Sequence, residues 1–257
     1  MGYFYFDESI HERGGFILGA WVFSDKDLTL LTSEAIKSVG LEPGRDEFKS
    51  GRRMDRDATQ RRLRERLKGL LAGTRLGLVI IPACGRATLG NEALAGLVKI
   101  VNANGLDRVH HDVFLDQGVA FENKSAALRQ AETRFPLHVY VEQDSRRVSG
   151  LQIADLAAHT MAVMFLETLG FVTKTVKAGS SSGYDPDLDV ELGFELWASI
   201  RYQFFTQDRP DPFTKDLTEG FTLDTASYCL HIAPSCSPQL RKAATERFGT
   251  CFVGCIH

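Results

Sequence analysis

Consecutive aromatic residues at the start of the chain constrain the fold more than any other sequence feature. Residues 3–6 (Tyr-Phe-Tyr-Phe) strongly favour β-structure, and we expect them to form a buried strand. The run ends at Asp7, Glu8 and Ser9. A carboxylate at the end of a central strand is held rigidly, which suits a metal ligand. The other interpretation is that Asp7 and Ser9 simply begin a polar turn.

The rest of the chain alternates between predicted strands and predicted helices. Apolar runs predict strands at residues 16–23, 76–81, 113–116 and 137–141. Helical periodicity predicts helices at residues 25–39, 55–71, 91–101, 121–134, 149–169 and 190–205. Ser24 or Asp25 is the expected N-cap of the first helix. We therefore expect an α/β fold with a mixed sheet that opens with a hairpin and is flanked by helices.

The chain divides into two predicted units. Residues 1–170 are expected to form the main domain, and residues 171–257 a C-terminal extension packed on it. Beyond the helix at 190–205, the extension reads as strand, helix, strand at residues 228–232, 238–248 and 251–256. This extension is a candidate addition to the sheet or a candidate surface for forming a homodimer.

Charge and hydropathy limit the classes of function that this chain can have. The 257 residues carry a formal net charge of −3, so any binding of nucleic acid depends on a local basic patch. No run of about 18 apolar residues is present, so we expect no transmembrane helix. The first residues lack the pattern of a secretory signal peptide, and we expect a cytoplasmic location.

The cysteines allow one alternative to a catalytic protein. Four of the five are grouped near the end of the sequence, at Cys229, Cys236, Cys251 and Cys255. Their spacings of seven and four positions differ from the tight Cys-x-x-Cys pair of many zinc sites. Free buried thiols are the favoured interpretation, and a structural zinc site is the alternative.

The predicted helix at residues 149–169 is apolar on nearly all sides but carries one polar stripe. Ser149, Gln152, Asp155 and His159 are separated by three, three and four positions, so they share a face. Burying an ionised carboxylate without a partner costs several kcal/mol. Asp155 is therefore expected to face a cation, an arginine or a solvent-filled cleft; a capping or salt-bridge role is the alternative.

Two other acids lie at strand ends, and a third lies in an extended segment. Asp7 ends the first predicted strand, and Asp116 ends the strand at residues 113–116. Glu47 and Lys49 are two positions apart, so on an extended segment their side chains point the same way. Carboxylate oxygens are the ligands that Mg²⁺ and Mn²⁺ prefer, and two such ions can cleave a phosphodiester.

A basic segment follows Glu47. Between residues 49 and 68 the positive side chains outnumber the acids. Arg52, Arg53, Arg56 and Arg62 are candidates for contacts with a phosphate backbone. The alternative is a solvated helix face with Arg–Glu pairs.

These motifs together resemble a known family. Residues 6–9 (Phe-Asp-Glu-Ser), 47–49 (Glu-Phe-Lys), 114–116 (Phe-Leu-Asp) and 150–156 (Gly-Leu-Gln-Ile-Ala-Asp-Leu) are similar to the pattern of the family catalogued as domain of unknown function thirty-eight hundred. The resemblance covers roughly residues 3–170. It implies a ribonuclease H-like fold and a metal-dependent nuclease activity. In the simplest ribonuclease H layout three strands come first, and the helix predicted before Glu47 departs from it.

The resemblance places the family's motif carboxylates on Asp7, Glu47, Asp116 and Asp155, with Lys49 and Gln152 as neighbours. The leading hypothesis is a nuclease that hydrolyses DNA or RNA with Mg²⁺ or Mn²⁺ bound by these four acids. Lys49 would steady the water or the phosphate, and Gln152 would join the arginines in binding nucleic acid. Strand alternation turns Glu8 to the opposite face from Asp7. The alternative hypothesis is a non-catalytic module of the same fold that binds nucleic acid or a protein.

Overall fold

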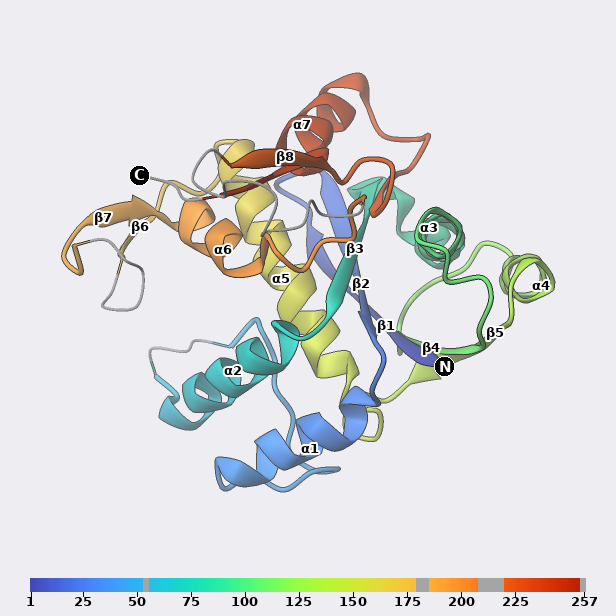
Figure 1. The fold of residues 1–257 in the computed structure, drawn as a ribbon, viewed down its shortest axis with the longest axis horizontal. Coiled ribbons are helices and arrows are strands. Elements are labelled where there is room, and N and C mark those ends of the chain that lie inside the picture. The colour runs from blue at the N-terminus through green and yellow to red at the C-terminus, as the bar shows by residue number, and fades with distance from the viewer. Residues whose placement is uncertain (53–55, 179–184, 208–219, 255–257) are drawn as a thin grey trace.

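The computed structural model describes residues 1–52, 56–178, 185–207 and 220–254. One mixed β-sheet runs through the centre, with helices on both of its faces (Figure 1). The main sheet has the strand order β5-β4-β1-β2-β3-β9. Its strands are β1 (Gly2–His11), β2 (Phe16–Ser24), β3 (Arg75–Pro82), β4 (His111–Asp116), β5 (Leu137–Gln143) and β9 (Leu230–Ile232).

The sheet combines an antiparallel meander with parallel additions. β1 pairs with β2 and β2 with β3 in antiparallel fashion, whereas β4 runs parallel to β1 and β5 parallel to β4. β9 runs parallel to β3 at the far edge. Two small sheets lie outside this one; they pair β6 (Thr175–Lys177) with β7 (Asp189–Glu191) and β8 (Phe221–Asp224) with β10 (Thr250–Val253).

Helices cover the two faces of the main sheet. They are α1 (Leu28–Ser38), α2 (Ala58–Leu71), α3 (Leu89–Ala103), α4 (Lys124–Arg134), α5 (Leu151–Thr168), α6 (Leu192–Ile200) and α7 (Pro238–Phe248), with a 3-10 helix at Ala83–Thr88 before α3. α5 packs on β1 and β2 and contacts α1 and α2, whereas α3 and α4 pack on β3 and β5 on the other side (Figure 1). The expected mixed α/β architecture, opened by a hairpin, is confirmed.

Two details of the first half differ from expectation. β2 extends through Ser24, so α1 begins later, and its N-cap is Asp27, whose carboxylate accepts from the Thr29 amide at 2.8 Å. The prediction of Ser24 or Asp25 as the cap was wrong because the strand continues into that position.

Although α1 and α2 lie between β2 and β3 in sequence, β3 still pairs with β2. The three N-terminal strands are therefore adjacent, and the topology is compatible with a ribonuclease H-like fold.

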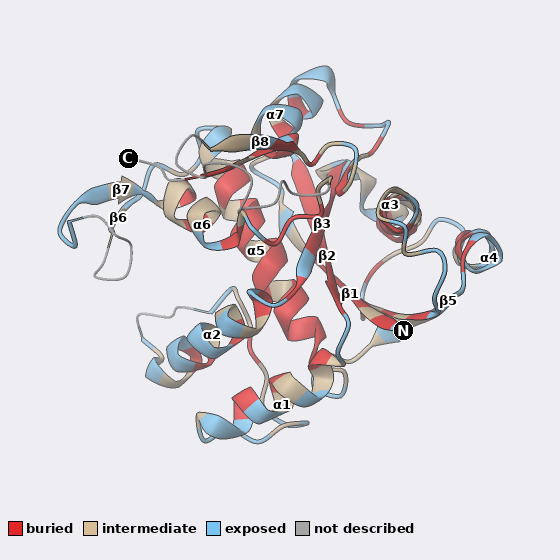
Figure 2. Cartoon of the chain, viewed as in Figure 1, coloured by how far each residue is buried: buried red, intermediate tan, exposed pale blue. Residues whose placement is uncertain are grey.

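The aromatic run of β1 forms the centre of the core. Phe4 and Phe6 point toward the α3 side of the sheet. Their ring centroids lie 6.1 Å and 4.7 Å from that of Trp21. The Trp21 indole donates to the Ala93 carbonyl oxygen at 3.0 Å, so its polar atom is satisfied inside the core. Figure 2 shows the buried residues concentrated along the central strands and α5.

Tyr5 points to the opposite face and ties three elements together. Its hydroxyl donates to the Asp27 carboxylate at 2.8 Å and accepts from the Leu28 amide at 3.1 Å, at the start of α1. Burial and the nearby Asp27 raise the pKa of Tyr5, so the hydroxyl keeps its proton. The ring also lies against Gly150, the N-cap of α5. The first strand thus fixes where both helices begin.

The C-terminal part of the chain is joined to the main sheet. β9 lies in that sheet beside β3, and α6 and α7 both contact α5. The division into residues 1–170 and 171–257 stays a prediction, as does a homodimer through the extension. Among the described residues, no helix combines the length and the apolar composition needed to cross a membrane.

The close contact at Gly150 makes a stability prediction. A Cβ at this position would lie 2.4 Å from a Tyr5 ring carbon, and the ring cannot retreat without breaking its hydrogen bonds. We expect Gly150→Ala to lower the free energy of unfolding by about 1–3 kcal/mol. Gly69→Ala is the matched control: Gly69 is exposed within α2 with no atom near the added Cβ, so this change is expected to stabilise the helix by up to about 1 kcal/mol. Urea denaturation measures the free energy of unfolding of both variants. Equal changes in the two variants would show that the contact between Gly150 and Tyr5 does not limit the side chain at position 150.

Candidate metal centre

Asp7 and Asp116 are brought side by side by the parallel pairing of β1 with β4. Phe6 is in register with Leu115, so the next residue on each strand is one of the two acids. Both aspartates are 8% exposed. The expectation that the first strand ends at Asp7 was wrong, because β1 continues to His11 while paired with β2; Asp7 lies where the pairing of β1 with β4 ends. The two paired strands still hold the two carboxylates close together in a largely dehydrated position.

Asp155 approaches the same point from α5, which packs across β1 and β2. The pKa of Asp7 is raised well above its ordinary value by burial, and then by the negative charges of Asp155, Asp116 and Glu8. A nearby like charge disfavours the ionised form of a carboxyl group and so raises its pKa. The three aspartates predicted from the sequence thus converge, together with Glu8.

Gln152 and Asp155, one helical turn apart on α5, hold an extended segment against the helix. The Gln152 side-chain oxygen accepts from the Phe48 amide at 2.8 Å, and the Asp155 carboxylate accepts from the Ser50 amide at 2.9 Å. The Ser50 hydroxyl donates to the other oxygen of Asp155. The Phe48 side chain is fully buried and anchors the segment. A stretch without helix or strand is therefore fixed from both its backbone and its side chains.

This segment brings Glu47 and Lys49 to the acids. The Glu47 carboxylate accepts from the Ser145 hydroxyl at 2.8 Å and lies 3.3 Å from the Lys49 ammonium. Gln60 of α2 donates to the Glu47 carbonyl at 3.0 Å. The charges of Glu47 and Lys49 both act on the pKa of Asp116. Although α1 and α2 are inserted between β2 and β3, Glu47 still lies near Asp116.

Electrostatic repulsion shapes this group of five acids, Asp7, Glu8, Glu47, Asp116 and Asp155, which we call the acid centre. Burial, together with Asp155 and Glu47, raises the pKa of Asp116 to about 6, against the opposing effect of Lys49. Burial and Asp116 raise the pKa of Glu8 to about 7, opposed by Arg86. Burial alone would lower the pKa of Lys49, but the surrounding carboxylates outweigh it and raise the value. Lys49 is thus a stable positive charge beside excess negative charge.

Two carboxylate oxygens of the acid centre are buried without a hydrogen-bond partner. They are Oδ1 of Asp116 and Oε2 of Glu8. A buried polar atom without a partner is costly, and a bound cation or a proton would satisfy it. An all-oxygen donor set of this kind fits a hard divalent cation such as Mg²⁺ or Mn²⁺.

Glu8 is the member of the acid centre that sequence reasoning passed over. Alternation along β1 turns it away from Asp7, yet its carboxylate interacts with Asp116 and Asp155. Glu8 lies within β1, two positions beyond Phe6, the last residue of that strand that pairs with β4. Its position directly after Asp7 was the only sequence signal.

The other predicted residues have varied surroundings. The amide of Gln152 is used within the protein, since it also donates to the Ser145 carbonyl at 2.9 Å, and the side chain is 1% exposed. Arg52, Arg56 and Arg62 are exposed on or before α2, and Arg53 lies outside the described residues. Arg52 also lines a cavity of about 180 Å³ that Glu47 shares, together with Arg45 and Arg146.

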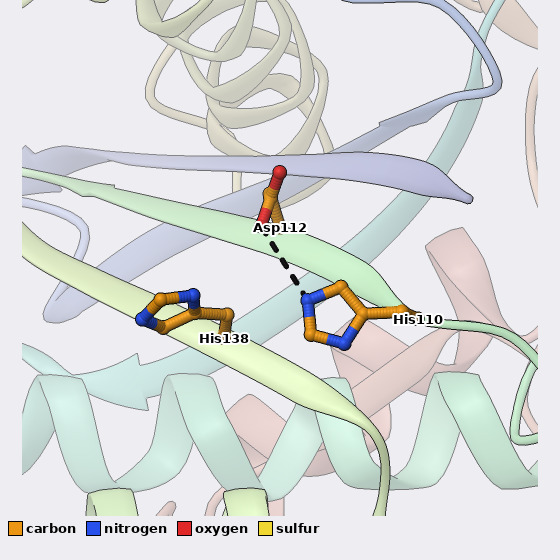
Figure 3. Close-up of side chains that lie close together, drawn as sticks. All are labelled: His110, Asp112 and His138. Atoms are coloured by element: carbon orange, nitrogen blue, oxygen red, sulfur yellow. Dashed lines mark ion pairs between the residues drawn. The ribbon is translucent and has the colours of Figure 1, made fainter.

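A second group of possible ligands lies elsewhere on the sheet. His110, Asp112 and His138 place one ligand atom each within 4.8 Å of one another (Figure 3). Within the described ranges no other set of three such residues is so closely spaced, so the acids of the acid centre are more widely separated. No described cysteine belongs to a group of this kind; Cys229 and Cys236 are buried free thiols, Cys251 is buried, and Cys255 lies outside the described residues.

The raised pKa values predict how stability depends on pH without divalent cations. The pKa values of Asp116 and Glu8, about 6 and about 7 in the folded protein, exceed the value near 4 of an unfolded carboxylate. Between these values the folded state binds more protons, so the free energy of unfolding falls as pH rises from about 4 to about 7. We expect Asp116→Asn to be more stable than wild type at pH 7.5 by roughly 1–3 kcal/mol, and to lose this advantage at pH 4.5.

Urea denaturation in the presence of a chelator measures this difference. Glu246→Gln, on an exposed position of α7, is the control and is expected to follow the wild-type pH profile. A wild-type protein that gained stability between pH 5 and pH 7 would contradict the mutual repulsion of the acids.

Comparisons with known proteins leave the family open. No family model matches the chain, and no curated protein matches it, so the resemblance to the domain of unknown function stays a prediction. A chain in the structure of the PCNA:RNase HII complex from Archaeoglobus fulgidus is similar, with a TM-score of 0.39 and 15% sequence identity, covering 73% of this chain and 84% of that one. The proposals that follow do not depend on this likeness.

Proposed function

We propose that the protein is a divalent-metal-dependent nuclease with a ribonuclease H-like fold, which hydrolyses phosphodiester bonds of DNA or RNA. The observation that carries the proposal is the convergence of Asp7, Asp116 and Asp155 from two strands and a helix. Their mutual repulsion in a buried position has no structural benefit, since uncharged side chains of similar size would pack there without this cost. Carboxyl groups whose pKa values are strongly raised by burial and by neighbouring acids cluster at functional sites.

Asp7, Asp116 and Asp155 would hold Mg²⁺ or Mn²⁺, with Glu47 and Glu8 as further ligands. Oδ1 of Asp116 and Oε2 of Glu8 have no hydrogen-bond partner, so both oxygens are available to bind a metal ion. Bound metal ions would activate water and neutralise charge on the phosphate. Ser50 fixes the orientation of the Asp155 carboxylate through both of its oxygens, and Ser145 fixes that of Glu47.

Lys49 and Gln152 have separate roles in this proposal. Lys49 stays protonated and half-exposed beside the carboxylates, so its ammonium is available to a phosphate oxygen. Gln152 is a positioning residue, because its amide joins the Phe48 backbone to the Ser145 backbone. It acts through the placement of Glu47 and Lys49 rather than by touching nucleic acid.

Exposed arginines next to Glu47 supply a path for the phosphate backbone. Arg52, Arg45 and Arg146 line the small cavity that includes Glu47, and Arg56 and Arg62 lie on or before the adjoining α2. Arg45 and Arg146 already pair with neighbouring acids. Local positive charge of this kind compensates for the net charge of −3 of the whole chain.

Cleavage assays test the nuclease. Wild type is expected to cut single- or double-stranded DNA or RNA with Mg²⁺ or Mn²⁺ and to be inactive with a chelator. Asp7→Asn and Asp155→Asn are expected to reduce the rate at least about 100-fold, because they remove ligand charge worth several kcal/mol in the transition state. Glu246→Gln, an exposed acid on α7, is the control and should leave the rate unchanged.

Equal cleavage by all variants would place the activity in a contaminant or another site. If no substrate is cut although the protein binds oligonucleotides, the binding-module alternative replaces the nuclease. Circular dichroism of each variant separates a lost metal ligand from a lost fold.

Salt titration tests the backbone path separately. In a chelator, Arg52→Gln combined with Arg62→Gln is expected to weaken binding of oligonucleotides of different sequence alike. It should also reduce the slope of log affinity against log salt by about 1 for each lost phosphate contact. Lys242→Gln, on the exposed face of α7, is the control for overall charge. An unchanged slope would show that these arginines do not contact phosphate.

A further inference from the structure

We propose that His110, Asp112 and His138 form a second metal site, which binds a first-row transition-metal ion of the Zn²⁺ class (Figure 3). The site shares no residue with the acid centre. It differs in chemistry as well, because it offers two imidazole nitrogens and one carboxylate. Imidazole ligands favour Zn²⁺, Co²⁺ or Ni²⁺ over Mg²⁺.

The pairing of two parallel strands builds the site. Asp112 of β4 is in register with His138 of β5, so their side chains leave the sheet on the same face as neighbours. His110 precedes Asp112 by two positions and lies on that face by alternation. Figure 3 shows the three side chains gathered over these two strands. The backbone thus sets their arrangement before any ion binds.

The separation of His110 from Asp112 fits a shared ion better than a direct hydrogen bond. Nε2 of His110 lies 3.6 Å from Oδ1 of Asp112, beyond the range of about 2.7–3.2 Å for N–H···O hydrogen bonds. Two ligands of one tetrahedral zinc ion, each about 2.0–2.1 Å from the metal, are separated by about 3.4 Å. The pair is therefore close to the spacing that zinc requires.

His138 has a partner that leaves one ring nitrogen for a metal. Its Nδ1 lies 3.1 Å from the Tyr140 hydroxyl, two positions further along β5. When Nδ1 carries the proton and donates to that oxygen, Nε2 presents its lone pair. A hydrogen bond from the second ring nitrogen is the usual support of a metal-bound histidine.

The site is separate from the acid centre and open to solvent. Asp112 and Asp116 are four positions apart on β4, or about 13 Å. The His110 side chain is 51% exposed and that of Asp112 is 17% exposed. Three protein ligands with room for water describe an open coordination shell, as in zinc sites that keep a free position. A bound ion would also connect the edge strand β5 to β4.

Metal titration tests the proposal. Untagged, chelator-treated protein is titrated with Zn²⁺ by calorimetry, with excess Mg²⁺ present to compete for the acid centre, where the proposed function places it. Co²⁺ is followed by its visible absorption. Wild type is expected to bind Zn²⁺ at this site and to unfold at a higher temperature when it is bound. His138→Ala and Asp112→Asn are expected to weaken this binding at least about 10-fold and to remove the cobalt spectrum.

Glu142→Gln, an exposed acid on the same strand, is the matched control and should bind Zn²⁺ as wild type does. Asp112→Asn keeps the shape of the side chain, so a loss of binding with an unchanged melting temperature in chelator reports the ligand and not the fold. Undiminished Zn²⁺ affinity in both ligand variants, or no Zn²⁺ binding by wild type, would overturn the site. Neither result depends on nuclease activity.

Discussion

Repulsion between buried carboxylates is the constraint on which the rest of this structure depends. The charges of Asp155 and Asp116 raise the pKa of Asp7, and that of Asp155 raises the pKa of Asp116, so the fold must hold these acids together against their repulsion. It does so with rigid elements: two paired strands and a helix packed across them. The aromatic run of β1, buried on both faces, supplies the packing energy that keeps the strand in place.

The elements with regular periodicity were predictable, and so were the acids they carry. Asp116 follows from an apolar strand that ends in a carboxylate, and Asp155 from helical spacing within an apolar helix. Asp7 was found because it follows the aromatic run of β1, although that strand continues to His11. The position of Glu47 could not be derived in this way. It depends on hydrogen bonds between a segment without regular structure and side chains of α5, more than a hundred residues later.

Local rules failed where strand ends and sheet edges decide the outcome. Alternation excluded Glu8, although its carboxylate interacts with Asp116. The cap of α1 moved to Asp27 because β2 runs on through Ser24. His110 and His138 carried no sequence signal, since only the register between β4 and β5 brings them together.

The hydrogen bonds by which Gln152 and Asp155 hold the segment around Phe48 have a consequence for protein synthesis. Glu47 and Lys49 leave the ribosome early, but the side chains that fix their segment are made much later. Until α5 has emerged and docked, a nascent chain carries an incomplete acid centre. The proposed nuclease would therefore stay inactive beside the messenger RNA and ribosomal RNA that surround it, and would become competent only after most of the chain has been translated.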